Sequence, residues 1–217
     1  MEHVPLESEL DLRQGVPVTA HIGAAGWRAG LPVLEGPGVM LRELRLQDAP
    51  SLLAMLATEE VARFMSPPPT DVQGFERFVV WTCEERAAGR LACFGIVPDG
   101  EDEAVGLFQV RQVEGGFDTA EWGVAIGSPF WGSGVYVESA TLVAGFAFET
   151  LHTYRLEARA AVINGRANGA LQKIGAVREG VLRRSLHTNG QHVDQILWSI
   201  LREDWFRSRR GPRVRVH

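Results

Sequence analysis

The spacing of hydrophobic and polar residues changes along the chain between the two-residue period of strands and the 3.6-residue period of helices. Strand patterns occupy residues 39–45, 90–97, 103–113, 117–126, 155–163, 177–187 and 192–202. Helical patterns begin after residue 48 and after residue 70, and two more follow at about 134–151 and 166–174. Because strands outnumber helices and each helix has an apolar face, we predict an α/β (α+β) fold, with a mixed sheet and helices on both of its faces.

Two of the helix starts carry capping signals. Asp48 precedes the first helix, and Pro50 stands in its first turn, a position that proline tolerates. Thr70 and Gln73 predict a capping box at the start of the second helix. The apolar stripe of that helix, which includes Phe75, is typical of a face packed in the core.

A glycine turn between a strand and a helix is the most informative segment. Residues 122–126 end a strand, Pro129 breaks it, and Gly132 and Gly134 open the next helix. The first N–H groups of a helix lack partners and carry partial positive charge, so such a turn can hold a phosphate. This turn has neither the lysine of a P-loop nor a third glycine at dinucleotide spacing. It fits a nucleotide bound through its phosphates, such as coenzyme A, and a tight turn without a ligand is the alternative.

Residues 130–139, which read Phe-Trp-Gly-Ser-Gly-Val-Tyr-Val-Glu-Ser, resemble the acyl-CoA segment of the GNAT superfamily of N-acetyltransferases. The likeness is to the branch typified by the ribosomal-protein N-terminal acetyltransferases, and the helix closes as it does there, with Ala147-Phe148-Glu149. Two further family segments match in order, at Asn164, Lys173, Gly175, Ala176, Glu179 and Gly180, and then at Gly190, Asp194, Asp204 and Trp205. The resemblance spans about residues 39–206, with Asp204 in the place of a family glutamate.

The resemblance implies the GNAT fold, whose central sheet is mixed and mostly antiparallel. It also implies an N-acetyltransferase that moves an acetyl group from acetyl-CoA to a primary amine by direct attack in a ternary complex, without a metal. The acceptor is a protein N-terminal α-amine or a small-molecule amine. Asn164 has a second interpretation, as a helix N-cap. The implied acetyl-CoA-binding residues are Val124, Ala125, Ile126, Trp131, Gly132, Ser133, Gly134, Val135, Tyr136, Asn164, Asn168 and Lys173.

Acyl transfer needs a neutral amine, so a base is the catalytic group to look for. An α-amine has an ordinary pKa of ~7.7–8.0 and needs little help. Glu121 stands at the start of the cofactor strand, where the family commonly has glutamate, and we predict that it accepts the proton directly or through water. A surface carboxylate is the equally supported alternative. His187 and His192 flank a hairpin turn and are further candidates, as is Asp194, with an exposed or bracing role as the alternative.

Three positions depart from the family pattern. Tyr136 stands where the family usually has alanine or glycine, and Ala167 replaces a serine. Leu171 stands where many members of the superfamily carry the tyrosine that protonates the leaving thiolate. These departures motivate an alternative function, a catalytically degenerate acyl-CoA-binding protein with a binding or interaction role.

Composition excludes several other classes of protein. The 217 residues carry a net charge of −5, which argues against general nucleic-acid binding. No apolar run approaches a membrane span, and the first residues lack the basic and apolar regions of an export signal. Cys83 and Cys93 form no metal pattern or disulfide framework and are expected as buried free thiols. We therefore expect a cytoplasmic protein without membrane or nucleic-acid partners.

The chain divides into three expected segments. Residues 1–38 are rich in glycine and proline and lack periodicity, which predicts an N-terminal extension or docking arm. Apolar residues such as Trp27 would be costly to leave in water, so we expect residues 22–34 to pack on the body or on a second subunit. A homodimer is therefore the candidate assembly, and an interaction protein built on this arm is a third functional class. Residues 39–206 form the predicted GNAT domain, and 207–217 a basic tail.

Overall fold

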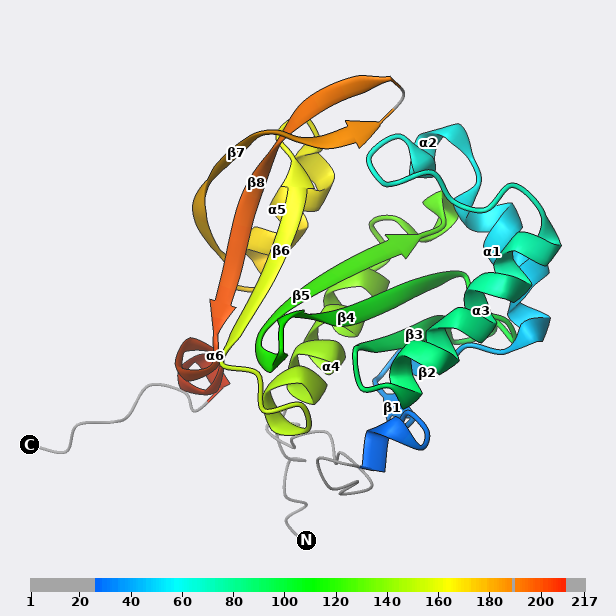
Figure 1. Ribbon diagram of the computed structural model, residues 1–217, viewed down its shortest axis with the longest axis horizontal. Coiled ribbons are helices and arrows are strands. Elements are labelled where there is room, and N and C mark those ends of the chain that lie inside the picture. Colours follow the sequence, from blue (N-terminus) through cyan, green and yellow to red (C-terminus); the bar gives the residue numbers. More distant parts are fainter. Residues whose placement is uncertain (1–25, 189, 210–217) are drawn as a thin grey trace, which may run out of the picture.

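An eight-stranded sheet forms the centre of the molecule (Figure 1). The computed structural model describes residues 26–188 and 190–209. Neighbouring strands are antiparallel except for β5 and β6, which are parallel, and the strand order is β1-β2-β3-β4-β5-β6-β8-β7. The strands are β1 (Leu34–Glu35), β2 (Val39–Glu43), β3 (Leu91–Pro98), β4 (Gly106–Glu114), β5 (Gly116–Ile126), β6 (Arg155–Ala161), β7 (Val177–Thr188) and β8 (Gln191–Leu201). The predicted mixed, mostly antiparallel sheet is confirmed.

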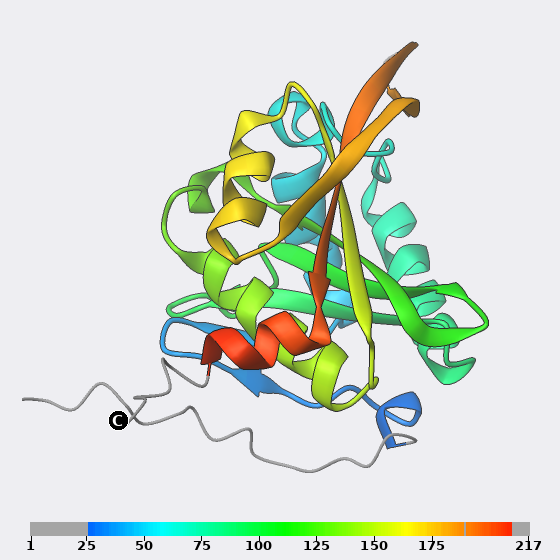
Figure 2. The same ribbon diagram turned by 90° about the vertical axis from the view of Figure 1, so that its left-hand side faces the viewer.

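Helices cover both faces of the sheet, as the sequence predicts (Figure 2). They are α1 (Ala49–Leu56), α2 (Glu59–Ala62), α3 (Val72–Ala87), α4 (Val135–Glu149), α5 (Gly165–Lys173) and α6 (Arg202–Arg209). The core under α4 takes Phe94 and Ile96 from β3, whereas the core under α1 and α3 takes Cys93 and Val97 from the same strand. Every residue of β3 is buried because its alternating side chains enter two cores.

Each predicted strand and helix coincides with an observed element, and the elements that the sequence pattern missed are short or polar. β1 has two residues and α2 has four, which is too few to show a period. The helix α6 is rich in charged residues, and only Trp205 is buried in it. This helix runs to Arg209, so it extends into the segment expected as a basic tail.

The two helices begin where the sequence predicts, but neither of the predicted side-chain caps forms. The α3 helix is capped by Asp71, whose carboxylate accepts from the Gly74 N–H at 2.6 Å, so Thr70 and Gln73 form no capping box. A carboxylate is favoured at this position because it also interacts with the helix dipole. Asp48 is the N-cap residue of α1 and Pro50 lies in the first turn, as predicted, but the Asp48 side chain makes no capping hydrogen bond there. Its carboxylate accepts instead from the buried guanidinium of Arg42.

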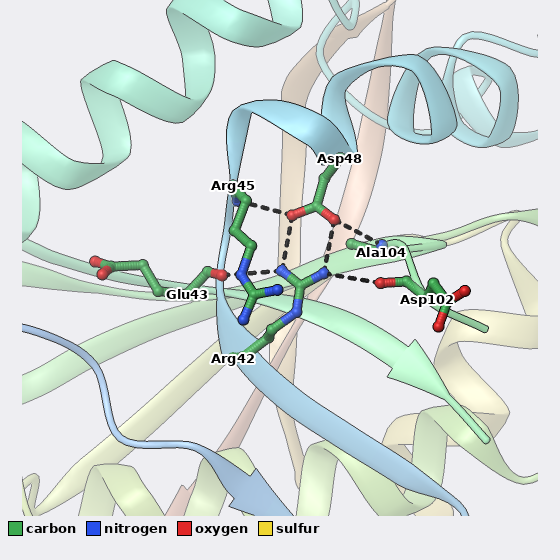
Figure 3. A network of polar contacts seen from close by, with 6 residues as sticks. All are labelled: Arg42, Glu43, Arg45, Asp48, Asp102 and Ala104. Carbon is green, nitrogen blue, oxygen red and sulfur yellow. Dashed lines mark hydrogen bonds and ion pairs between the residues drawn. The ribbon is translucent and has the colours of Figure 1, made fainter. Parts of the chain in front are cut away.

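Arg42 of β2 forms a buried ion pair with Asp48, which lies in the short turn of helix at residues 46–48 before α1 (Figure 3). Both Asp48 oxygens accept from the Arg42 guanidinium at 2.8 Å, and the backbone N–H groups of Arg45 and Ala104 donate to them at 2.7 and 3.0 Å. Burial by itself raises the pKa of the Asp48 carboxyl, but these hydrogen bonds outweigh burial and hold the pKa below its ordinary value. The pair fixes the start of α1 against the sheet.

The segment from Gly26 onward packs on the body. Trp27 is 2% exposed, and its ring meets that of Phe117 edge-to-face, with 5.5 Å between centroids. Leu34 is also buried, and its strand β1 pairs with β2. Docking is thus observed for the part of the expected arm that the structure describes, and Ile22 lies outside the described residues. Cys93 is buried, as expected, whereas Cys83 is only partly buried.

Candidate functional site

Strands β5 and β6 separate after a short parallel pairing. Residues 119–121 pair with residues 155–157, and beyond this point β5 continues to Ile126 beside β4 alone, while β6 continues beside β8. The carbonyl of Ile126 accepts from the Trp131 indole at 2.9 Å, which satisfies one backbone group that a neighbouring strand would otherwise bond. The separation opens into a cleft of about 950 Å³. Four elements line it: the end of β5, the glycine turn with the start of α4, α5, and α2 with the loop that follows.

The glycine turn presents open backbone to this cleft. Gly132 and Gly134 have φ values of 81° and 94°, and a Cβ added at either position would meet no atom within 4 Å. Gly134 is the N-cap of α4 and has no side chain to occupy the first N–H groups of the helix, although the Ser133 hydroxyl accepts from the Val135 N–H at 3.5 Å. The turn therefore fits the pyrophosphate of a coenzyme A molecule, because an anion can approach these N–H groups closely.

Glu138 is the carboxylate nearest to this turn in sequence, and it points elsewhere. Its Oε1 atom accepts from the Gly38 N–H at 2.7 Å, which ties α4 to the turn between β1 and β2. A carboxylate in the first turn of a helix stabilises it through the dipole. Since the Glu138 side chain is held by Gly38, it braces the helix and leaves the glycine turn free of this negative charge.

Most of the predicted acetyl-CoA-binding residues line the cleft. They are Val124, Ala125, Ile126, Trp131, Gly132, Gly134, Tyr136, Asn164 and Lys173. Ser133, Val135 and Asn168 do not line it. The Ser133 hydroxyl donates to the Phe130 carbonyl at 2.7 Å, and Val135 is buried in the core under α4.

The two asparagines of α5 have structural contacts. The Asn164 carboxamide oxygen accepts from the Ala167 N–H at 3.0 Å, so this residue caps α5 while it also lines the cleft. Asn168 donates to the carbonyls of Ala161 and Asn164, at 2.9 Å each, and accepts from the Trp198 indole at 2.9 Å. Asn168 thus joins α5 to β6 and β8. Both asparagines position the helix that forms one wall of the cleft.

Sequence reasoning missed Arg166, which lines the cleft beside the glycine turn. Its guanidinium lies 3.8 Å from the centre of the Trp131 ring, a cation–π arrangement. The sequence gives one indication of this contact. Arg166 lies in the first turn of a helix, where a cation is unfavourable beside the positive end of the helix dipole unless another group compensates for it. The partner itself follows only from the packing of α5 against the turn.

The wall of the cleft that faces α5 was also not predicted from the sequence. It consists of α2 and the loop after it, with Glu59, Glu60, Arg63, Phe64 and Met65 among the lining residues. The hairpin of β7 and β8 reaches this loop, where the Thr188 hydroxyl lies 3.4 Å from the Arg63 carbonyl and 3.5 Å from that of Met65 (Figure 1). Two segments far apart in sequence therefore meet at this side of the cleft.

Glu121 lies just before the point where β5 and β6 separate, and it does not line the cleft. Its carboxylate pairs with Arg111 at 2.6 Å, and Arg159 is 3.9 Å away. His187 and His192 stack across the hairpin with 4.7 Å between centroids, outside the lining of the cleft. Asp194 accepts from the Arg184 N–H at 2.7 Å and so braces the same hairpin. The role of Glu121 as a base stays a prediction.

Comparisons with known proteins agree with this geometry. A family model described as an acetyltransferase (GNAT) domain matches residues 39–177. The uncharacterized N-acetyltransferase p20 of Bacillus licheniformis is 25% identical over 166 residues, which cover 76% of this chain and 93% of that protein. The ribosomal protein uS5-alanine N-acetyltransferase of Escherichia coli (strain K12) is 28% identical over 118 residues, which cover 54% of this chain and 61% of that protein. The structure of Mycobacterium smegmatis RimJ in complex with CoA-disulfide shares the fold, with a TM-score of 0.71 and 24% identity. The match covers 80% of this chain and 87% of that one.

The chain belongs to the GNAT acetyltransferase family, whose model matches more than half of its length. Relatives are named N-acetyltransferases, and the chain is an enzyme of the acyltransferase class. The family uses acetyl-CoA as the acyl donor and an amine as the acceptor. Among residues 26–188 and 190–209, no group of three or more histidine, cysteine, aspartate or glutamate side chains is placed to hold a metal ion. None of the described helices is long and apolar enough to cross a membrane.

Proposed function

We propose that this enzyme transfers the acetyl group of acetyl-CoA to a primary amine by direct attack in a ternary complex. The observation that carries the proposal is the separation of β5 from β6, because it opens one cleft that joins the glycine turn to a second wall at α2. A donor and an acceptor held in one such cleft gain rate from positioning alone. The splayed strands provide the place where the two meet.

On the donor side, the turn before α4 binds the pyrophosphate through backbone N–H groups, and residues 124–126 border the pantetheine arm. Arg166 and Lys173 add positive charge on the α5 wall. Val124 is 37% exposed, and the edge of β5 beside it has no partner strand among the described residues. A backbone N–H on this edge polarises the acetyl carbonyl, as an oxyanion hole does.

On the acceptor side, we propose that the amine enters past α2. Glu59 and Glu60 line this wall and attract the amine in its ammonium form. A protein N-terminal α-amine is the first acceptor to test, since one relative acts on the alanine of ribosomal protein uS5. Glu121, which Arg111 holds just before the point where β5 and β6 separate, takes the proton through water.

The decisive experiment incubates the purified full-length protein with acetyl-CoA and a panel of amines. The panel contains a peptide with an N-terminal alanine, the same peptide with a blocked N-terminus, a polyamine and an amino sugar. Release of free thiol that depends on the amine, with an acetylated product detected by mass spectrometry, supports transfer. Binding of acetyl-CoA by calorimetry without turnover of any amine would leave the catalytically degenerate binder as the function.

A homodimer in which the N-terminal segment crosses to a second subunit is a separate proposal. Its support is that Trp27 and Leu34, in the part of the expected arm that the structure describes, dock on an apolar surface. Sedimentation of the full-length chain and of a chain lacking residues 1–25 tests it. A monomer in both cases would reject the dimer without affecting the proposed transfer.

A further inference from the structure

Glu138 lies on the side of α4 that continues from the glycine turn. It follows Gly134 by four positions, and residues at i and i+4 lie above one another on a helix. Side chains of a helix also lean toward its N-terminus, so an unheld Glu138 carboxylate would extend toward the first N–H groups of α4. A carboxylate there would repel the pyrophosphate that this turn is proposed to bind. The affinity of the turn for an anion therefore depends on where the Glu138 carboxylate is held.

The turn between β1 and β2, at residues 36–38, holds this carboxylate. The Gly38 N–H donates to Glu138 Oε1 at 2.7 Å, and the Gly38 carbonyl accepts from the Asp99 N–H at 3.1 Å. The turn is closed by a hydrogen bond from the Gly36 N–H to the Val39 carbonyl, at 2.9 Å. The donor that meets Glu138 is thus fixed by the sheet and by its own turn, independently of α4.

Glycine at residue 36 leaves room for the carboxylate. A Cβ built on Gly36 would overlap Glu138 Oε1 and lie 3.1 Å from the Cδ and Cγ atoms of the same side chain. A Cβ built on Gly38 would lie 3.4 Å from Oε2, an ordinary contact. A methyl group at residue 36 therefore displaces the end of the Glu138 side chain, which is flexible and can move without disturbing the backbone.

We propose that the turn between β1 and β2 sets the affinity for acetyl-CoA, because it keeps the Glu138 carboxylate away from the pyrophosphate site. The inference rests on the proposed binding of acetyl-CoA at the glycine turn. Glu138 does not line the cleft, so it is a positioning residue and acts through the charge that the turn withholds. Coupling between two equilibria is reciprocal, so bound acetyl-CoA in turn strengthens the contact between Gly38 and Glu138.

The binding test displaces the carboxylate with one methyl group. We expect Gly36→Ala to raise the Kd for acetyl-CoA about fivefold, because the released charge lies near the pyrophosphate. In a Glu138→Gln background the same substitution should change the Kd less than about twofold, since no charge is released. Gly30→Ala is the matched control, because a Cβ there meets no atom within 4 Å. Isothermal calorimetry measures the Kd, and circular dichroism checks that each variant folds.

Two further readouts separate an effect of charge from a loss of structure. Added salt should reduce the loss of affinity in Gly36→Ala, because salt screens the repulsion. The KM for the amine at saturating acetyl-CoA should stay unchanged. An unchanged Kd in Gly36→Ala, or a loss of the same size in the Glu138→Gln background, would overturn the proposal. A wild-type protein that binds no acetyl-CoA would reject the proposed function itself.

Amide exchange in the wild type tests the reciprocal effect without any substitution. Exchange of the Gly38 N–H should slow about fivefold when coenzyme A saturates the protein. Gly74 is the control, because its N–H also donates to a carboxylate, that of Asp71, and neither residue lines the cleft. Unchanged exchange at Gly38, or equal slowing at both glycines, would contradict a specific coupling between the turn and the cofactor site.

Discussion

Gly134 has a backbone conformation that other residues rarely adopt, at the point where the first N–H groups of α4 face the cleft. Gly134→Asp adds a Cβ and a negative charge at the proposed pyrophosphate site. Charges at a helix terminus are worth up to ~2 kcal/mol, so we expect the Kd for acetyl-CoA to rise by about tenfold or more. Isothermal calorimetry on the folded variant measures the change.

Gly100→Asp is the matched control for this substitution. Gly100 also has a positive φ, 87°, with no atom near an added Cβ, but it lies in the turn after β3 and not in the cleft. Both variants therefore carry similar backbone strain and the same added charge. Equal affinities of the two variants for acetyl-CoA would move the phosphate site away from the glycine turn.

Asp48→Asn leaves the Arg42 guanidinium buried without its counter-charge. Removing one partner of a buried ion pair costs about 3–5 kcal/mol, so we expect a loss of this size in the free energy of unfolding at pH 7. Urea unfolding followed by circular dichroism measures it. Asp204→Asn is the control, because Asp204 forms an exposed pair with Arg207 at 3.0 Å and should lose less than about 1 kcal/mol.

The same pair predicts a pH dependence of stability. The folded pKa of Asp48 lies below the ordinary value of an aspartate, ~3.9, so the unfolded chain binds the proton more readily. The contribution of Asp48 is complete above the unfolded pKa and is lost as the pH falls through the folded pKa. The stability difference between the wild type and Asp48→Asn should therefore shrink below about pH 4. A difference that stayed constant down to pH 2 would contradict the lowered pKa.

At the scale of elements, the short helix before β1, at residues 26–28, is held mainly by the buried side chain of Trp27. Trp27 is 2% exposed, and Arg86 of α3 donates to the neighbouring Arg28 carbonyl. Trp27→Ala removes a large buried ring, and we expect a loss of about 3–5 kcal/mol in the free energy of unfolding. Thermal and urea unfolding measure the loss.

Val33→Ala is the control in the same segment, since Val33 is 49% exposed and should change stability by less than about 0.5 kcal/mol. Equal, small effects of the two variants would mean that the segment contributes little to the folded state. Amide exchange at residues 26–34 gives a second measurement, because a docked segment exchanges more slowly than an unfolded peptide.

At the scale of the whole molecule, the two walls of the cleft differ in charge. Arg166 and Lys173 line it on α5 without a carboxylate, whereas Glu59, Glu60 and one cation, Arg63, line it on the α2 side. We expect Lys173→Gln to weaken acetyl-CoA binding and Glu60→Gln to raise the KM for a cationic amine. Each effect is at most about 1 kcal/mol, or up to about fivefold, because these side chains are exposed.

The two variants control for each other. Lys173→Gln should leave the KM for the amine unchanged, and Glu60→Gln should leave the Kd for acetyl-CoA unchanged. Added salt should reduce both differences, because exposed charges are screened. If each substitution altered both constants equally, the donor and the acceptor would not occupy separate ends of the cleft.

The order of strands and helices could be predicted from the sequence because periodicity, caps and turns act between neighbouring residues. The glycine turn was identified for the same reason, since Gly132, Gly134 and the start of α4 lie within a few positions. The helix α2 and the strand β1 were missed because such short elements form only when the rest of the fold is present. Asp48 is the N-cap residue of α1, as the sequence predicts, but its carboxylate bonds to Arg42 and not to the helix, because the fold buries the two side chains together.

The sequence by itself determined the fold class, the family and the turn that faces the cleft. The tertiary structure alone decided which side chains line the cleft and which brace its walls. Asn164 and Asn168 are four residues apart, yet only Asn164 lines the cleft, because Asn168 is held by Ala161 of β6 and Trp198 of β8. The α2 wall likewise depends on Thr188, 125 residues from Arg63. Contacts between residues so far apart in the sequence leave no pattern in the neighbouring residues, because they follow from how whole elements pack.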